Sequence, residues 1–119
     1  MGQNFKKVLL VEDYPGWIKI IKGGLENEAE VLSAATIREA ENIFSENSDI
    51  AIIIMDACVP GDEPNTLPLV KKIRETFKGP IIAISSSDSY RKQLVEAGCD
   101  YECEKKKIPS MVRHVLRTI

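Results

Sequence analysis

Hydrophobic residues along the chain follow two patterns: short, mostly apolar runs, and longer stretches in which apolar residues recur every three or four positions. A continuous apolar run is typical of a strand covered on both faces, whereas the wider spacing is typical of a helix with one buried face. The two patterns alternate along the chain. Strands are expected at residues 8–11, 30–34, 50–55, 81–84 and 100–104.

A helical pattern follows each expected strand. Pro15 and Pro109 suit the first turns of the first and last helices, and Thr36 with Glu39 forms a capping box for the second. The two glycines at 23–24 predict a weakened end of the first helix. The apolar positions expected to face the core are Trp17, Ile20, Ile21, Leu25, Ile37, Ala40, Ile43, Phe44, Leu69, Val70, Ile73, Phe77, Tyr90, Leu94, Val95, Ala97, Val112, Val115, Leu116 and Ile119.

Strand and helix therefore alternate five times, with no internal repeat or linker. Such alternation predicts an α/β fold in which a parallel sheet carries helices on both faces and the crossovers are right-handed. We expect one domain over residues 1–119, with a five-stranded, doubly wound, flavodoxin-like sheet in the order 2-1-3-4-5. Strands one and three are then neighbours, and a ligand site is expected beyond their carboxyl ends.

Charge and composition narrow the possible partners. The net charge of −2 argues against the basic surface that direct nucleic-acid binding requires. No apolar run is long enough to span a membrane, and residues 1–7 lack an apolar segment of signal-peptide length. We expect a cytoplasmic protein that contacts neither nucleic acid nor membrane directly. Cys58, Cys99 and Cys103 lack paired zinc-ligand spacing, so they are interpreted as reduced thiols filling small buried spaces.

Acidic residues follow two of the expected strands at their carboxyl ends. Glu12 and Asp13 follow the first strand, and Asp56 follows the third, where a turn at residues 59–61 leaves its carboxylate open. Adjacent parallel strands bring these three acids together, and such a cluster is costly unless it is protonated or binds a cation. Mg²⁺ prefers oxygen ligands, so a magnesium site is predicted, with the backbone carbonyl of Cys58 as a further ligand.

Two other strand ends supply complementary groups. Ser85 ends the fourth strand and offers a hydroxyl, and Lys105, at the close of the fifth, offers an ammonium group. Each has an ordinary alternative, because Ser85 can be a helix cap and residues 104–107 can be a solvated charge run. A carboxylate with a metal, a hydroxyl and an ammonium beside it is what an incoming phosphoryl group needs. The predicted chemistry is transfer of phosphate onto Asp56.

The order and spacing of these residues resemble the response-regulator receiver domains of two-component signalling, over Lys6 to Ile119. The matching motifs are VLLVEDYP, IIIMDACVPG, KKIRE, GPIIAISS and AGCDYECEK.

The resemblance implies a phosphoprotein of a phosphorelay rather than an enzyme. Asp56 would accept the phosphoryl group from a histidine kinase or phosphotransfer protein, while Ser85, as switch hydroxyl, and Lys105 would hold the phosphoryl oxygens. Mg²⁺ would be bound by Glu12, Asp13, Asp56 and the Cys58 carbonyl. A monomer or weak dimer is implied, with an output protein docking near helix 4, strand 5 and helix 5.

Three features depart from the family pattern. Glu102 occupies the position of the usual aromatic switch residue, with Tyr101 beside it, and Lys106 replaces the usual proline after the lysine. Tyr101 is expected on the opposite face of a regular strand from Glu102. The loop after Asp56, through residues 62–66, is about two residues longer than the family's usual loop.

Other functions remain open at the level of sequence. A receiver-like domain that binds partners independently of phosphate is the main alternative. A small aspartyl-phosphate phosphohydrolase would need a second aspartate two residues after the nucleophile, where this chain has Cys58. A flavin- or nucleotide-binding domain would need a glycine-rich turn after the first strand, where residues 12–16 are acidic and contain one glycine.

Overall fold

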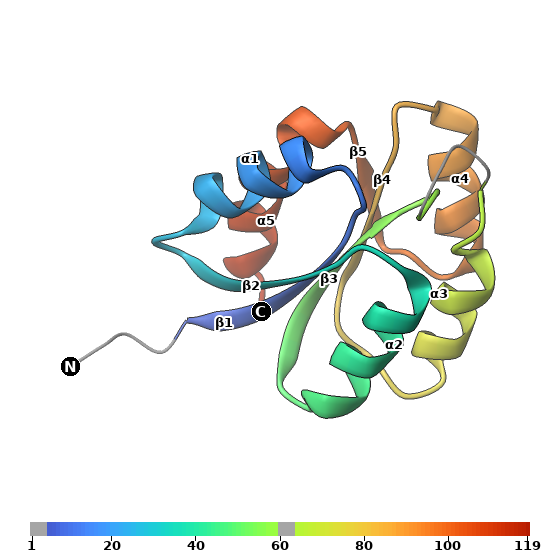
Figure 1. Cartoon of the computed structure of the whole chain (residues 1–119), viewed down its shortest axis with the longest axis horizontal. Coiled ribbons are helices and arrows are strands. Elements are labelled where there is room, and N and C mark those ends of the chain that lie inside the picture. Colours follow the sequence, from blue (N-terminus) through green and yellow to red (C-terminus); the bar gives the residue numbers. More distant parts are fainter. Residues whose placement is uncertain (1–4, 60–63) are drawn as a thin grey trace.

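Five parallel strands form one sheet in the order β2-β1-β3-β4-β5 in the computed structural model, which describes residues 5–59 and 64–119 (Figure 1). This strand order confirms the fold class expected from the sequence. The strands are β1 (Lys6–Val11), β2 (Ala29–Ala34), β3 (Ile50–Asp56), β4 (Ile81–Ile84) and β5 (Tyr101–Cys103).

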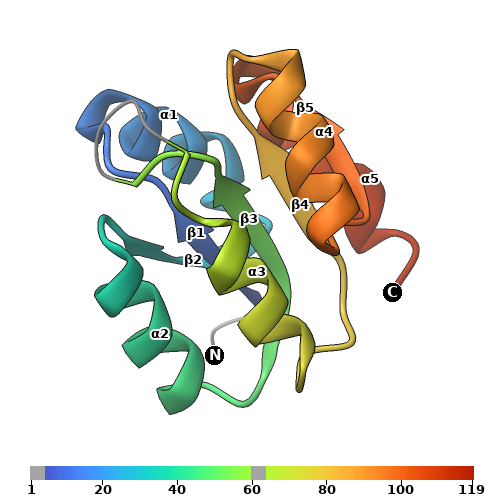
Figure 2. The same ribbon diagram turned by 90° about the vertical axis from the view of Figure 1, so that its right-hand side faces the viewer.

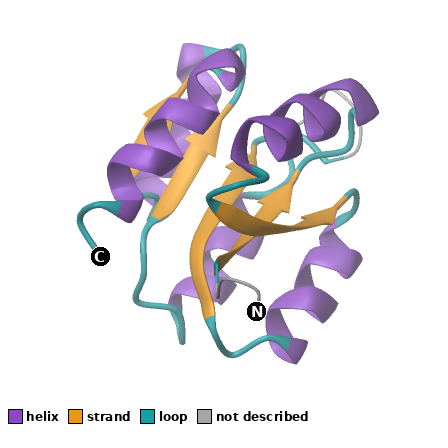
Figure 3. Ribbon diagram, turned by 90° about the vertical axis from the view of Figure 1, so that its left-hand side faces the viewer, coloured by secondary structure: helices purple, strands orange, loops and turns teal. Residues whose placement is uncertain are grey.

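Helices cover both faces of the sheet (Figures 2 and 3). Helices α1 and α5 pack on one face, and α2, α3 and α4 pack on the other. Their bounds are α1 (Pro15–Leu25), α2 (Ile37–Glu46), α3 (Leu67–Arg74), α4 (Asp88–Ala97) and α5 (Ile108–Leu116), with a 3₁₀ turn η1 (Lys105–Lys107) before α5.

The central strand β3 contributes to both hydrophobic cores. Ile52 and Ile54 face the α1 and α5 side, whereas Ile53 and Met55 face the α2, α3 and α4 side, and all four side chains are fully buried. Burial on both faces explains why this strand is apolar throughout. The first charged side chain of this strand is therefore that of Asp56, its last residue, at the carboxyl end of the sheet.

Helix caps follow the sequence signals. Thr36 Oγ1 accepts a hydrogen bond of 3.1 Å from the Glu39 amide, and the Glu39 carboxylate accepts one of 2.8 Å from the Ala35 amide. Ser87 caps α4 by accepting a hydrogen bond from the Tyr90 amide at 3.2 Å. These bonds satisfy backbone donors that a helix start leaves without partners.

Three residues expected in the core are exposed instead. Ile20, Val95 and Ile119 are 56%, 36% and 51% exposed. Ile20 is adjacent to the buried Ile21, and consecutive residues on a helix point about 100° apart, so only one of them faces the sheet. Val95 stands in the same relation to the buried Leu94, and Ile119 lies beyond the end of α5.

The glycine pair at 23–24 lies in the last turn of α1, which ends at Leu25, so the weakened helix end stays a prediction. Gly24 allows α1 to approach α5, because a Cβ atom at this position would lie 2.8 Å from Pro109 Cγ. The Gly24 carbonyl also accepts a hydrogen bond of 3.1 Å from Arg113 on α5. Gly23 has open space around it.

Alanine substitutions at these two glycines are expected to change the free energy of unfolding in opposite directions. Gly23→Ala should raise the free energy of unfolding by about 0.5 to 1 kcal/mol, because alanine favours the helix and meets nothing. Gly24→Ala should be about 1 to 3 kcal/mol less stable than Gly23→Ala, because the rigid Pro109 ring overpacks. Urea unfolding of both variants measures the difference. Equal stabilities would mean that α1 and α5 separate without cost.

None of the described helices is long and apolar enough to cross a bilayer. The longest of them, α1, has 11 residues, whereas a helical span needs about 20.

Candidate functional site

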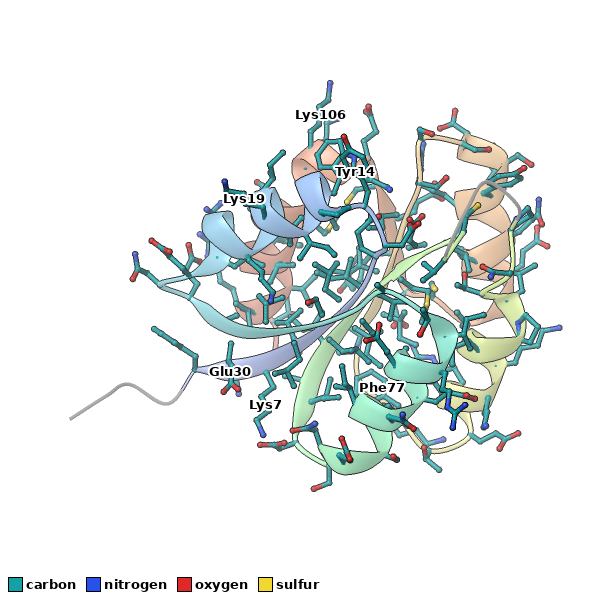
Figure 4. All side chains as sticks on the ribbon, in the orientation of Figure 1. Lys7, Tyr14, Lys19, Glu30, Phe77 and Lys106 are labelled. Carbon is teal, nitrogen blue, oxygen red and sulfur yellow. The ribbon has the colours of Figure 1, made fainter. Side chains whose placement is uncertain are left out.

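The carboxyl ends of β1, β3 and β4 open into a cleft of about 510 Å³. Every residue predicted for the site from the sequence lines this cleft. Its lining is Glu12, Asp13, Tyr14, Trp17, Asp56, Cys58, Ser85, Ser86, Tyr90 and Lys105. Tyr14, one of these lining residues, is labelled in Figure 4.

Three carboxylates meet in the cleft. Asp56 is the last residue of β3 and is 5% exposed, and Glu12, directly after β1, is fully buried. Each of these and Asp13 has a carboxylate oxygen within 4.8 Å of the others. The Glu12 amide extends the pairing of β1 with β2 by donating to the Ala34 carbonyl at 3.0 Å, which holds Glu12 at the sheet edge.

Lys105 contacts two of the three carboxylates in this cluster. Its Nζ donates a hydrogen bond of 3.1 Å to Asp56 Oδ2 and lies 2.7 Å from Glu12 Oε1. The side chains of Lys106 and Lys107 are mostly exposed, and both pair with Glu104. Lys106 is labelled in Figure 4. The lysine run therefore contributes Lys105 to the cleft and leaves its other two members at the surface.

The position of Lys105 differs from the sequence expectation in one respect. Strand β5 ends at Cys103, and Lys105 opens the 3₁₀ turn η1 rather than closing the strand. The turn carries the chain directly into α5, whose second residue is Pro109. Lys106, which stands where the family usually has proline, is thus the middle residue of this turn.

Burial and like charge act on Asp56. Burial, together with the nearby Glu12 charge, raises the pKa of the Asp56 carboxyl to about 6, although Lys105 and the Cys58 backbone oppose this shift. Burial alone would lower the pKa of Lys105, but its contacts with Glu12 and Asp56 outweigh burial and raise the pKa. The cleft thus holds a carboxylate that costs free energy to ionise and a lysine that stays charged.

The carboxylate cluster fits a hard divalent cation. Oxygens of Glu12, Asp13 and Asp56 lie within 4.8 Å of one another, and Lys105 Nζ contacts those of Glu12 and Asp56. One ammonium group offsets only part of the charge of three ionised carboxylates, and carboxylate oxygens are the ligands that such a cation prefers. Cys58 lines the same cleft, and its carbonyl as a ligand stays a prediction.

Ser85 follows β4 and is 6% exposed. Because Asp56 pairs with Ile84 in the β3–β4 register, Ser85 leaves the sheet beside the acidic cluster. Its Oγ accepts a hydrogen bond of 3.1 Å from the Ser87 amide, which leaves the hydroxyl proton able to donate into the cleft.

Thr66 secures the loop after Asp56, a role that the sequence did not predict. Thr66 is fully buried, and its hydroxyl donates to the Asp56 carbonyl at 2.7 Å. The Asn65 side chain both accepts from the Val59 amide and donates to the Val59 carbonyl. Part of the expected loop extension at 62–66, and of the turn at 59–61, lies outside the described residues. In the sequence, the polar pair Asn65 and Thr66 directly before an apolar helix could have indicated this role.

The sequence did not predict a role for Arg91 either. It lies on α4 and is 9% exposed, and its guanidinium contacts the Ser85 carbonyl, Asp88 and Glu102. Glu102 therefore points to the α4 side, and Tyr101 packs on the opposite face with the α5 core, as expected. A charged residue is normally expected at the surface. The spacing of three residues between Arg91 and Leu94 on one helix face could have indicated that Arg91 is buried.

The cysteines divide into two groups. Cys99 and Cys103 are buried, as expected, and burial raises the pKa of their thiols to about 12 and about 11. Cys58 is only partly buried, at the wall of the cleft, which corrects the expectation that it fills a buried space. All three are free thiols.

Similarity to known proteins is found by structure rather than by sequence. No protein-family model matches the chain, and no curated protein matches it. Three similar solved structures are a two-component response regulator from Clostridium difficile, the BeF3-activated N-terminal receiver domain of RstA from Klebsiella pneumoniae, and the chemotaxis protein CheY4 from Vibrio cholerae.

In each of these comparisons, the similarity covers nearly the full length of both proteins. The Clostridium difficile protein has 22% identity and a TM-score of 0.80 over 94% of this chain and 96% of its own. The RstA domain has 23% identity and a TM-score of 0.77 over 94% and 96%. CheY4 has 22% identity and a TM-score of 0.78 over 98% and 99%. The chain therefore has the fold of response-regulator receiver domains.

Proposed function

We propose that this chain is a phosphoacceptor module of a two-component phosphorelay, in which Asp56 receives a phosphoryl group from a histidine kinase or phosphotransfer protein. The observation that carries the proposal is the contact of Lys105 with both Asp56 and Glu12 in a cleft that Ser85 and Asp13 also line. The names of the structural relatives, response regulator and receiver domain, support it.

The transfer is a single displacement at phosphorus. An Asp56 carboxylate oxygen forms the new P–O bond as the P–N bond to the donor imidazole breaks, and the leaving imidazole takes up a proton from solvent. The ammonium group of Lys105 offsets charge on the phosphoryl oxygens, and the Ser85 hydroxyl donates a hydrogen bond to one of them. The chain thereby takes part in its own phosphorylation without turning over a separate substrate.

Residues Glu12, Asp13 and Asp56, with the Cys58 carbonyl, would hold Mg²⁺ in this cleft. When bound, the ion supplies positive charge that offsets repulsion between the acids and the incoming phosphoryl group. The chain's own residues shape the site around it, since Thr66 anchors the backbone at Asp56 and the β1–β2 pairing anchors Glu12.

Incubation with acetyl phosphate and Mg²⁺ tests the proposal. Intact-mass measurement should detect one labile phosphoryl adduct that hydroxylamine removes, as expected of an acyl phosphate, and peptide mapping should assign it to Asp56. Asp56→Asn should abolish the adduct, whereas Asp49→Asn should retain it, because Asp49 is an exposed acid at the other end of β3 that pairs with Lys7. Chelation of Mg²⁺ should greatly slow adduct formation.

The single tryptophan of the sequence gives an independent readout. Trp17 lines the cleft, so its fluorescence should change on titration with Mg²⁺ and again with acetyl phosphate. An undiminished adduct in Asp56→Asn would reject the acceptor assignment. Absence of any adduct on the wild-type chain would instead favour a receiver-like domain that acts independently of phosphate.

A further inference from the structure

Arg91 joins three elements beside the candidate site. It lies in α4, which packs against β5 (Figure 2). Its Nη1 donates to the Ser85 carbonyl at 2.5 Å, its Nε donates to Glu102 Oε1 on β5 at 3.3 Å, and its Nη2 pairs with Asp88 in the first turn of α4.

A buried guanidinium group is costly unless its donors are satisfied. Arg91 is 9% exposed, and its partners are one carbonyl and two carboxylates that approach from different elements. The rigid fork of arginine can bond in several directions at once, whereas the single ammonium of lysine cannot reproduce that geometry. The position therefore requires arginine in particular, not merely positive charge.

Through these bonds the Ser85 hydroxyl is tied to α4. Ser85 Oγ accepts from the Ser87 amide, Ser87 caps α4, and the Ser87 carbonyl accepts from the Arg91 amide at 3.1 Å. Arg91 then returns to the Ser85 carbonyl, which closes a loop of contacts. A shift of the Ser85 backbone toward a group on Asp56 would therefore change its contact with the Arg91 guanidinium.

Glu102 carries that contact to the molecular surface. Its side chain is 37% exposed, in contrast to 10% for Arg91, so the ion pair runs from a buried site to an accessible one. Glu102 stands where the family pattern has an aromatic residue, and the structure gives it an ionic partner instead.

We propose that Arg91 is a positioning residue that orients Ser85 and, through Glu102, couples a phosphoryl group on Asp56 to the surface formed by α4 and β5. The proposal rests on the proposed phosphoacceptor function. It assigns this chain an ion pair, in place of an aromatic side chain, as the connection between the site and that surface. The two linked positions are the Ser85 hydroxyl and the Glu102 carboxylate, and the coupling is a difference in their preferred arrangement with and without the phosphoryl group.

Glu102→Ala tests the outward half of the coupling, with Glu104→Ala as a matched control two residues further along. Hydrogen exchange of residues 88–103 is compared with and without acetyl phosphate and Mg²⁺, and adduct yield is measured on the same samples. Glu102→Ala should keep adduct yield within about twofold, because Arg91 still holds Ser85, but lose most of the adduct-induced exchange change at residues 101–103. Glu104→Ala should behave as wild type.

Arg91→Lys tests the inward half, with Arg74→Lys as its control. Arg74 also bonds several carbonyls and an aspartate, but it connects α3 to Gly98, Gly79 and Asp100, away from Ser85. Arg91→Lys should slow adduct formation by about 10-fold or more, because small misplacements of a binding group carry large rate costs. Arg74→Lys should reduce stability without slowing adduct formation.

The outcomes separate this proposal from the function on which it rests. If the wild-type chain forms no adduct at Asp56, both fall. If the adduct forms and Glu102→Ala still transmits the full exchange change, the coupling through Glu102 is refuted while the acceptor function stands. Equal rates for Arg91→Lys and Arg74→Lys would likewise reject Arg91 as a positioning residue.

Discussion

Replacing Lys105 with methionine is expected to lower the free energy of unfolding by about 3 to 5 kcal/mol at neutral pH without divalent cations, because removing one partner of a buried ion pair leaves uncompensated charge. The lysine side chain is 17% exposed, and the side chains of its partners Glu12 and Asp56 are 0% and 7% exposed. Urea unfolding followed by Trp17 fluorescence measures the change.

The Lys105→Met loss should shrink in mild acid and in saturating Mg²⁺. Without the ammonium group, the remaining carboxyls hold protons more tightly in the folded state, so protonation restores stability as pH falls. A bound cation would replace the missing charge. Lys106→Met is the control, with an expected change within about 0.5 kcal/mol, because its side chain is 70% exposed. If both variants unfolded alike at neutral pH, the acids would not depend on Lys105.

Asp56→Asn is expected to act in the opposite direction, raising the metal-free free energy of unfolding at pH 7 by about 1 to 3 kcal/mol. Folding raises the Asp56 pKa from 3.8 to about 6, so the folded state holds the proton more tightly than the unfolded chain. Ionisation of Asp56 therefore costs stability as pH rises from about 4 to 6. Asparagine avoids that cost, while Lys105 keeps its contact with Glu12.

Unfolding of wild type and Asp56→Asn should be measured across this pH range. The two proteins should be equally stable below about pH 3, where both the folded and the unfolded wild type hold the proton, and should diverge toward pH 7. Added Mg²⁺ should narrow the difference by binding the folded wild type. Asp49→Asn is the control and should show no such gain, because the Lys7 contact lowers the pKa of Asp49. A clear loss of stability for Asp56→Asn at pH 7 would mean that its carboxylate is a structural hydrogen-bonding group.

Sequence patterns were sufficient for the strand order and for bringing the acids together. Alternating strands and helices leave few parallel topologies, and the carboxyl ends of neighbouring strands share one edge. The clustering of Glu12, Asp13 and Asp56 could therefore be predicted from the sequence. The same reasoning was wrong for Ile20 and Val95, since helical periodicity does not choose between adjacent apolar residues.

The doubly wound fold and a carboxylate cluster beside a hydroxyl could be predicted from the sequence, because strand periodicity and strand ends are local properties of the chain. The sequence also pointed to Lys105, but its place in a 3₁₀ turn and its contact with Glu12 as well as Asp56 follow from the three-dimensional arrangement. Only the tertiary structure decided that Arg91 is buried. Its partners come from the end of β4, the first turn of α4 and β5, and a charge is buried only where such partners converge in space.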